Sequence, residues 1–141
     1  MSRKRVKVLF VCTGNSCRSQ IAEGLLREMG GDKYEVFSAG SHPSRVHPMS
    51  IEIMKEAGID ISSHTSDPID DYLNLGIDVV ITVCDSAQQV CPVFPGDAAQ
   101  IHWSIEDPFQ GWEFENSQLD SFRKTREIIR KRIDNFIKQG H

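Results

Sequence analysis

The sequence predicts an α/β protein in which a parallel β-sheet lies between layers of helices. Short apolar runs rich in β-branched residues alternate with longer segments whose apolar residues recur at helical spacing. Two of the apolar runs end directly at a cysteine, and glycine or proline separates most segments. Because alternating strands and helices build right-handed βαβ units, we expect one three-layer domain over residues 1–141.

The first half of the chain supplies two strands and two helices. The run VKVLFV, which precedes Cys12, predicts the first strand, and residues 34–39 predict the second. Between them, apolar residues at helical spacing predict a helix that Gly30 and Gly31 stop. After a loop over 40–47, Pro48 suits the first position of the second helix.

The second half continues the alternation after a polar stretch over 60–71. The run IDVVITV over 77–83 predicts a strand that ends at Cys84, and residues 101–104 predict a shorter one. From about Ser117 a long helix is expected to run to the end of the chain. Its apolar stripe consists of Leu119, Phe122, Ile129, Ile133, Phe136 and Ile137.

Composition narrows the classes of function. The net charge of −4 offers no general attraction to nucleic acid or to an anionic membrane. No apolar run approaches the ~18 residues of a membrane span, and the N-terminus lacks the small-residue cleavage site of a signal peptide. We therefore expect a cytoplasmic monomer that acts without nucleic acid or membrane. In that compartment, four cysteines favour chemistry or metal binding over structural disulfides.

The segment between the first strand and the first helix, CTGNSCRS, has the composition of an anion-binding loop. Backbone N–H groups in such a turn point inward, and a helix N-terminus adds partial positive charge. Gly14 permits close approach of the backbone, and Asn15 tolerates left-handed dihedral angles. The expected oxyanion-binding residues are Thr13, Gly14, Asn15, Ser16, Cys17, Arg18 and Ser19.

Cys12 lies at the edge of this loop and is the candidate nucleophile. The N–H dipoles, the Arg18 guanidinium and the hydroxyl of Ser16 or Ser19 favour a thiolate, so we expect a lowered pKa. Arg18 can donate two parallel hydrogen bonds to a tetrahedral oxyanion. The alternative is a buried cysteine that merely ends a strand. Cys17 is expected to pack inside the loop rather than to react.

Three residues distant in sequence are expected at one edge of the sheet. Cys12, Cys84 and Asp107 each come shortly after a predicted strand, and open α/β sheets place their ligands at the carboxyl ends of the strands. If the first and third strands are neighbours, their ends lie roughly 5 Å apart. A disulfide between Cys12 and Cys84 would then need little movement of the main chain.

A further cysteine, Cys91, follows Cys84 by seven residues. If the intervening segment were helical, the two Cα atoms would lie about 10 Å apart, which exceeds the reach of a disulfide. We therefore hypothesise that this polar segment is a redox-driven element with two conformations, in which local unwinding lets the two thiols meet.

The motifs together resemble the thioredoxin-coupled arsenate reductases of the low-molecular-weight protein tyrosine phosphatase superfamily. CTGNSCRS is similar to the active-site loop of that superfamily, and VITVCDSAQQVCP and HWSIEDP are similar to reductase segments. The resemblance implies four parallel strands in the order 2-1-3-4. The phosphatases usually carry Tyr after Asp-Pro, where this chain has Phe109, and they lack the Cys84/Cys91 pair.

The resemblance also implies a mechanism with three thiols and an acid. Arsenate, with phosphate or sulfate as mimics, would bind in the loop against Arg18, and Cys12 would attack arsenic while Asp107 protonates the departing oxygen. Cys84 would then attack Cys12 and release arsenite, and Cys91 would carry the disulfide outward to thioredoxin. The sequence itself leaves glutathione and glutaredoxin open as the reductant.

No cofactor is required by this chemistry, although some reductases of the family hold a potassium ion beside the loop. The matching positions here are Asn15, Glu23, Ser38 and Asp67. Oxygen ligands suit a hard cation, yet the same carboxylates are equally explained as hydrogen-bond supports of a basic loop.

Two other functions are compatible with parts of the pattern. A low-molecular-weight phosphatase would hydrolyse phosphate monoesters through a phosphoenzyme on Cys12, and weak phosphatase activity can coexist with reduction. A zinc module could use the four thiolates, but the C-x4-C and C-x6-C spacings fit zinc poorly.

Overall fold

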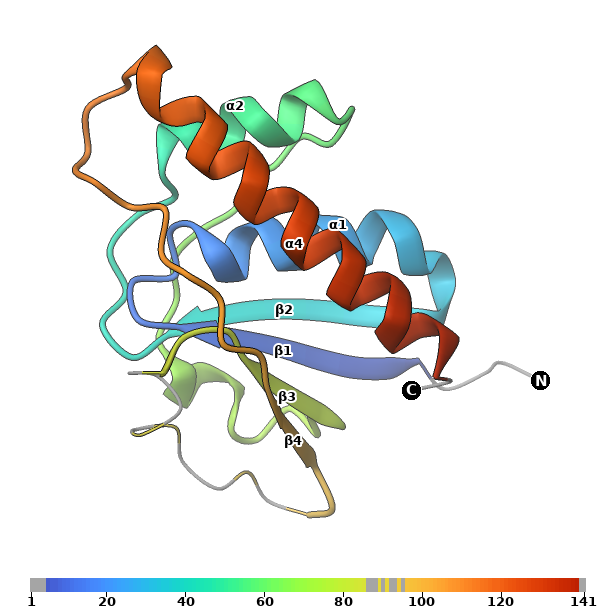
Figure 1. Ribbon diagram of the computed structural model, residues 1–141. Helices are drawn as coiled ribbons and strands as arrows, with labels where there is room; N and C mark the ends of the chain where they lie inside the picture. Colours follow the sequence, from blue (N-terminus) through green and yellow to red (C-terminus); the bar gives the residue numbers. More distant parts are fainter. Residues whose placement is uncertain (1–4, 86–88, 90, 92–93, 95, 140–141) are drawn as a thin grey trace.

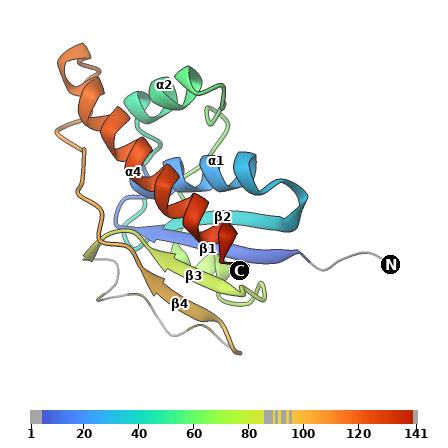
Figure 2. The ribbon, with the colours of Figure 1, turned by 45° about the vertical axis from the view of Figure 1, so that its right-hand side comes forward.

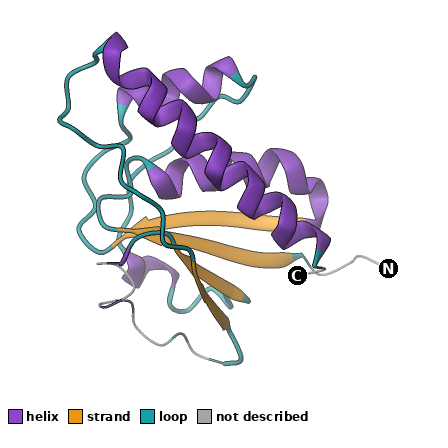
Figure 3. Cartoon of the chain, in the orientation of Figure 1, coloured by secondary structure: helices purple, strands orange, loops and turns teal. Residues whose placement is uncertain are grey.

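The computed structural model describes residues 5–139, except for 86–88, 90, 92–93 and 95. Its centre is a four-stranded parallel sheet in the order β2-β1-β3-β4, which confirms the expected strand order. The strands span Val6–Cys12 (β1), Tyr34–Gly40 (β2), Val79–Thr82 (β3) and Ala99–His102 (β4). Figure 1 and Figure 3 show these strands lying side by side beneath the helices.

The two inner strands form the buried middle of the sheet. Residues 8–12 of β1 and all of β3 are buried, as expected for strands covered on both faces. Val11 pairs with Thr82, and the Val83 N–H donates to the Val11 carbonyl at 2.8 Å. The carboxyl ends of β1 and β3, and the residues that follow them, are therefore adjacent.

Three helices lie above one face of the sheet: α1 (Arg18–Gly30), α2 (Pro48–Glu56) and α4 (Leu119–Lys138) (Figure 2). Helices α1 and α4 contact each other, and α1 packs on β1 and β2. The predicted apolar stripe of α4 is largely buried, with Phe122, Ile129 and Ile133 fully covered. Below the sheet, a 3-10 turn over Ile69–Tyr72 packs on β2 through a ring contact of 5.5 Å between Tyr72 and Phe37.

Element boundaries differ modestly from those predicted. Strand β3 is shorter than the apolar run 77–83, and β4 begins two residues before the predicted 101–104. The last helix starts at Leu119, after a 3-10 turn over Asn116–Gln118. The hypothesis of a segment with two conformations between Cys84 and Cys91 falls mainly on residues 86–88 and 90, which lie outside the described residues.

Within the described part of the chain, no helix combines the length and the hydropathy needed to cross a membrane.

Candidate active site

The loop after β1 is shaped as an anion-binding turn. Its backbone leaves the sheet at Cys12, passes through Asn15 with a positive φ of 50°, and enters α1 at Arg18. The end of β2 supports it from one side, because the Ser41 N–H donates to the Cys12 carbonyl at 3.1 Å. At Gly40 the backbones are so close that a Cβ atom would lie 2.6 Å from the Thr13 carbonyl oxygen.

A chain of hydrogen bonds orients the hydroxyl beside the candidate nucleophile. The Asn15 side-chain amide donates to Ser19 Oγ at 2.7 Å and to Ser38 Oγ at 3.0 Å. Ser19 Oγ lies 2.8 Å from Cys12 Sγ. Because the Ser19 oxygen already accepts from Asn15, we assign its own proton to Cys12. Ser38 in turn donates to Glu23. The chain thus stabilises a negative charge on sulfur.

The effect of burial on the pKa of Cys12 outweighs the effect of these hydrogen bonds. The Cys12 side chain is only 3% exposed, and burial raises the pKa of its thiol, although the Ser19 hydrogen bonds and Arg18 lower it. The expected lowered pKa is therefore wrong, because the sequence shows the donors but not the burial of the thiol. Burial likewise raises the pKa of Cys17 to about 12, which agrees with a packing role.

The second thiol of the predicted relay lies next to the loop. Cys84 follows β3, is 3% exposed, and has its Sγ 3.3 Å from Thr13 Oγ1. Thr13 directly follows Cys12, so the structure brings the two cysteines to the same edge of the sheet. All four cysteines are free thiols. Within the described residues, no group of three or more His, Cys, Asp or Glu side chains is arranged to hold a metal ion.

The predicted anion-binding arginine and the predicted acid are paired. Arg18 Nη2 lies 3.2 Å from Asp107 Oδ2, and Nη1 donates to the Ile105 carbonyl at 2.8 Å. The Asp107 side chain is 48% exposed, and its other oxygen accepts from the Phe109 N–H at 3.0 Å. The Asp107 carboxylate thus lines the cavity of the loop from a segment that is distant in the sequence.

Cys12, Arg18 and Asp107 line one cavity of about 300 Å³, together with loop residues 13, 14, 16 and 17. Ser44, Phe109 and Trp112 complete its lining. The sequence did not indicate Ser44 or Trp112 as site residues. The two aromatic rings are 5.1 Å apart, and the Arg45 guanidinium lies 4.3 Å from the Trp112 ring. No sequence pattern marked Trp112, because the fold brings it to the loop from a distant segment.

Phe109 and Trp112 form an aromatic wall of the cavity, and His47 fixes the position of this wall. Its Nδ1 accepts from the Met49 N–H at 3.1 Å, so its Nε2 donates to the Gly111 carbonyl at 2.7 Å. Its ring also stacks on Trp112 with centroids 5.3 Å apart. The first turn of α2 and the segment after Asp107 are thereby joined at the entrance to the cavity.

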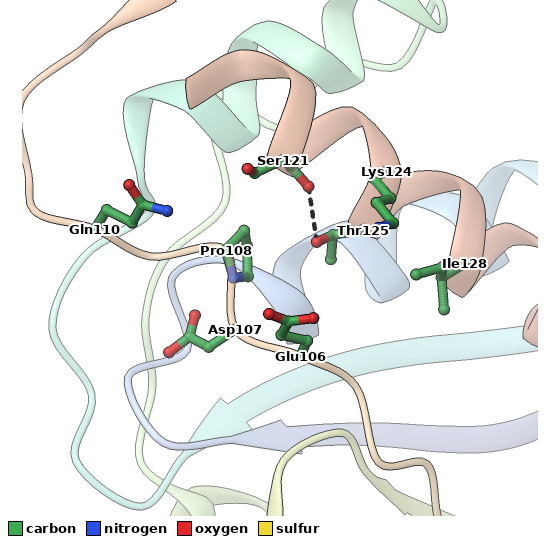
Figure 4. A pocket seen from close by; sticks show the side chains of 8 residues that line it. All are labelled: Glu106, Asp107, Pro108, Gln110, Ser121, Lys124, Thr125 and Ile128. Carbon is green, nitrogen blue, oxygen red and sulfur yellow. Dashed lines mark hydrogen bonds between the residues drawn. The ribbon is translucent and has the colours of Figure 1, made fainter. Parts of the chain in front are cut away.

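A second cavity, of about 130 Å³, lies between residues 106–108 and helix α4 (Figure 4). It is bounded by residues 106–108 and by α4 side chains such as Lys124 and Ile128. Figure 4 shows the Asp107 carboxylate turned towards the loop after β1, and the Glu106 carboxylate turned towards α4. Of the two neighbouring carboxylates, only Asp107 lines the cavity of Cys12.

Cys91 occupies a different place from the other two relay cysteines. It is half-buried and lines a small cavity of about 60 Å³ against β3 and β4, together with Thr82 and His102. Burial raises the pKa of its thiol. The structure therefore places two thiols at the loop and the third outside it, against the edge strand.

The residues proposed for potassium gather beside the loop. Glu23, Ser38 and Asp67 line one cavity of about 270 Å³, and the Asp67 N–H donates to the Asn15 side-chain oxygen at 3.0 Å. The Glu23 carboxylate already pairs with Arg27 at 2.6 Å.

Comparisons with known proteins identify the family of the chain. Residues 7–140 match the family model described as low molecular weight phosphotyrosine protein phosphatase. The chain is 43% identical over 133 residues to an arsenate reductase of Halalkalibacterium halodurans, covering 94% of this chain and 96% of the relative.

Two solved structures are similar over almost the whole chain. An arsenate reductase in the phosphate-binding state aligns with a TM-score of 0.75 and 40% identity, covering 94% of this chain and 97% of that one. The thioredoxin-dependent arsenate reductase of Corynebacterium glutamicum aligns with a TM-score of 0.77 and 33% identity, covering 99% of this chain and 63% of that longer one.

Proposed function

The chain belongs to the low molecular weight phosphotyrosine protein phosphatase family, and within that family we propose that it is an arsenate reductase that thioredoxin regenerates. One observation carries the proposal: a second buried thiol, Cys84, contacts Thr13 in the anion-binding loop at 3.3 Å. Ester hydrolysis through Cys12 has no use for that thiol, whereas a two-electron reduction requires it.

In the first step arsenate binds in the loop, held by backbone N–H groups and Arg18. Because burial raises the pKa of the Cys12 thiol, we propose that the thiol passes its proton to the arriving oxyanion. The thiolate, stabilised by the Ser19 hydroxyl at 2.8 Å, attacks arsenic. Once the anion replaces it at Arg18, the half-exposed Asp107 carboxylate takes up a proton from water and passes it to the departing oxygen, which leaves as water.

The second step transfers electrons. The Cys84 thiolate attacks Cys12 Sγ, so a sulfur–sulfur bond forms while the sulfur–arsenic bond breaks. Arsenic takes the electron pair of the broken bond, is reduced from As(V) to As(III), and leaves as arsenite. Cys91 then attacks Cys84, which frees Cys12 and leaves a disulfide between Cys84 and Cys91. Two thiols of thioredoxin reduce that disulfide.

This cycle needs a reducing compartment, and we propose that the protein works as a monomer in the cytoplasm. The net charge of −4 supports independence from nucleic acid and membranes. Nothing in the relay requires a residue from a second copy, since its thiols, acid and arginine belong to one chain.

We propose potassium as an accessory ligand rather than a reactant. Burial and the Asp67 charge raise the pKa of Tyr72, which indicates a negative environment where Glu23, Ser38 and Asp67 meet. A cation there would add positive charge behind the hydrogen-bond chain to Cys12. Its test is thermal unfolding in potassium chloride against choline chloride, where Glu23→Gln should abolish any stabilisation that potassium gives the parent protein.

A second, weaker activity is favoured by the aromatic wall. Phe109 and Trp112 line the cavity of Cys12, and an inorganic oxyanion does not need two apolar rings. We propose slow hydrolysis of aryl phosphates, in which water cleaves the phosphoenzyme. With p-nitrophenyl phosphate as the probe, this activity should disappear in Cys12→Ser and persist in Cys91→Ser.

The decisive experiment is arsenate-dependent oxidation of NADPH with thioredoxin and thioredoxin reductase. Wild type should turn over, while Cys12→Ser, Cys84→Ser and Cys91→Ser should each abolish multiple turnover. Cys91→Ser should still release one arsenite per protein and accumulate the Cys12–Cys84 disulfide. Full turnover by Cys91→Ser would contradict the relay, and its loss together with unfolding would instead favour the zinc module.

A further inference from the structure

His102, the last residue of β4, bridges the two sides of Cys84. Its Nδ1 lies 2.8 Å from Thr82 Oγ1, two residues before the cysteine. Its Nε2 lies 2.8 Å from Asp85 Oδ1, directly after the cysteine. One imidazole therefore contacts the chain on both sides of Cys84, at Thr82 and at Asp85. Figure 2 shows β4 running beside β3, the strand that leads to this thiol.

The imidazole is itself fixed in the sheet. His102 pairs with Thr82 in the register of β3 and β4, and the next N–H, from Trp103, donates to the Thr82 carbonyl at 2.8 Å. The Trp103 side chain is 6% exposed and contacts Phe10 with ring centroids 5.9 Å apart. The residue that follows His102 is thus anchored in the core.

Asp85, by contrast, is an exposed residue that this bond helps to hold. Its side chain is 70% exposed, and its hydrogen bonds, first to His102 and then to Ser104, lower its pKa below the ordinary range. Exposed side chains are held weakly unless a charge-assisted bond fixes them. The bridge therefore joins the rigid edge of the sheet to the first residue of the segment that leads to Cys91.

We propose that His102 is a positioning residue for the reduction step, which keeps Cys84 beside the loop so that its sulfur can attack Cys12. The inference rests on the proposed arsenate reduction. In that step the sulfur–sulfur bond forms as the sulfur–arsenic bond breaks, and arsenic keeps the electron pair. The attack requires the three atoms to be in line, and a fixed main chain at Cys84 supplies that alignment.

The location of Cys91 supports the same assignment. Cys91 lines a cavity of about 60 Å³ together with His102 and Thr82. The imidazole thus lines the cavity of Cys91 and also contacts the residues Thr82 and Asp85 that flank Cys84. A side chain placed there can hold Cys84 during the first attack, while Cys91 waits outside the loop.

The test is a single-turnover reaction in the Cys91→Ser background, where the relay stops at the Cys12–Cys84 disulfide. Disulfide formation is followed by mass spectrometry after rapid acid quench, across a series of arsenate concentrations. His102→Ala and Asp85→Ala should each lower the maximal rate about tenfold, as expected for loss of a charge-assisted hydrogen bond. The half-saturating arsenate concentration should stay within twofold, because the loop that binds the anion is untouched.

Two further variants separate positioning from general damage. Asp85→Asn keeps a hydrogen-bond acceptor for His102, so its rate should recover to within threefold of the parent. Gln100→Ala lies on the same strand and lines the same small cavity, and should leave the rate and half-saturation within twofold. Thermal unfolding of each variant reports whether β4 itself is weakened.

The inference is overturned if His102→Ala and Asp85→Ala react at the parent rate. It is also overturned if the maximal rate and the melting temperature fall while the half-saturating arsenate concentration rises, since that is the effect of a merely structural residue. If the Cys91→Ser parent forms no disulfide with arsenate, the proposed function fails and this inference fails with it. Loss of positioning alone leaves the proposed function intact.

Discussion

Gly40→Ala should damage the active-site loop without touching any chemical group. Gly40 ends β2, and an added Cβ would lie 2.6 Å from the Thr13 carbonyl oxygen and 3.0 Å from the Asn15 nitrogen. Ordinary contact begins at 3.4 Å, so the loop backbone must withdraw by about 0.8 Å. The φ of Gly40 lies outside the left-handed region, so the collision is the cause rather than the dihedral angle.

Both catalysis and stability should respond. A displacement of about 1 Å costs roughly 10²-fold in rate, so kcat/KM for arsenate should fall roughly 30- to 100-fold. Overpacking should also cost about 1–3 kcal/mol of the free energy of unfolding. The assays are thioredoxin-coupled NADPH oxidation and denaturant unfolding.

Gly24→Ala is the matched control for this substitution. Its Cβ would meet Ile61 Cγ2 and Met54 Cε, each at 2.9 Å, and side-chain ends can move where a backbone cannot. Alanine also favours the helix by about 0.8–1 kcal/mol, so this variant should keep its activity within twofold. Wild-type kcat/KM in Gly40→Ala would refute the claim that the loop is held rigidly against β2.

Three further substitutions test the acid, the thiolate and a distant ion pair. Ser19→Ala removes the hydroxyl 2.8 Å from Cys12 Sγ, so the thiol pKa should rise and alkylation by iodoacetamide should require higher pH; an unchanged pH profile would contradict the assignment. Asp107→Asn should lower kcat by about 10²-fold or more with little change in KM, whereas a change confined to KM would exclude the role of proton donor. Glu56 of α2 pairs with Arg123 of α4 at 2.6 Å, and Glu56→Gln should lower the free energy of unfolding at pH 7 by about 0.5–1 kcal/mol, measured by urea unfolding. Because the Arg123 hydrogen bonds lower the Glu56 pKa from 4.5 to about 2, that difference should be complete above pH 4.5 and vanish as pH falls towards 2.

Hydrophobic patterning predicted the inner sheet because burial and strand pairing coincide there. Residues 8–12 of β1 and all of β3 are buried, so their apolar runs marked both the strands and the cysteines that follow. At the edge strand the two properties separate. Ala99 and Gln100 are exposed yet pair with β3, so the pattern placed β4 two residues late.

The site was predictable where its residues share a local motif, and less so where the fold assembles it. The loop from Cys12 to Ser19 could be predicted because strand, turn and helix start follow one another in sequence. Trp112 could not be predicted as a site residue, because tertiary packing, including its stacking on His47, brings it to the cavity. The pKa of Cys12 was mispredicted for a related reason: burial by distant segments is not visible in a local motif.

The choice between reduction and hydrolysis depends on which nucleophile reaches the Cys12 adduct first. The loop and Arg18 accept either tetrahedral oxyanion, so binding does not separate the two reactions. Water must diffuse into the cavity, while a thiol held beside the loop would act at a far higher effective concentration. Cys84, 3% exposed and 3.3 Å from Thr13, is held at that position. Anything that loosens it, at Thr13 or at His102, should therefore shift the product ratio away from reduction before it alters oxyanion binding.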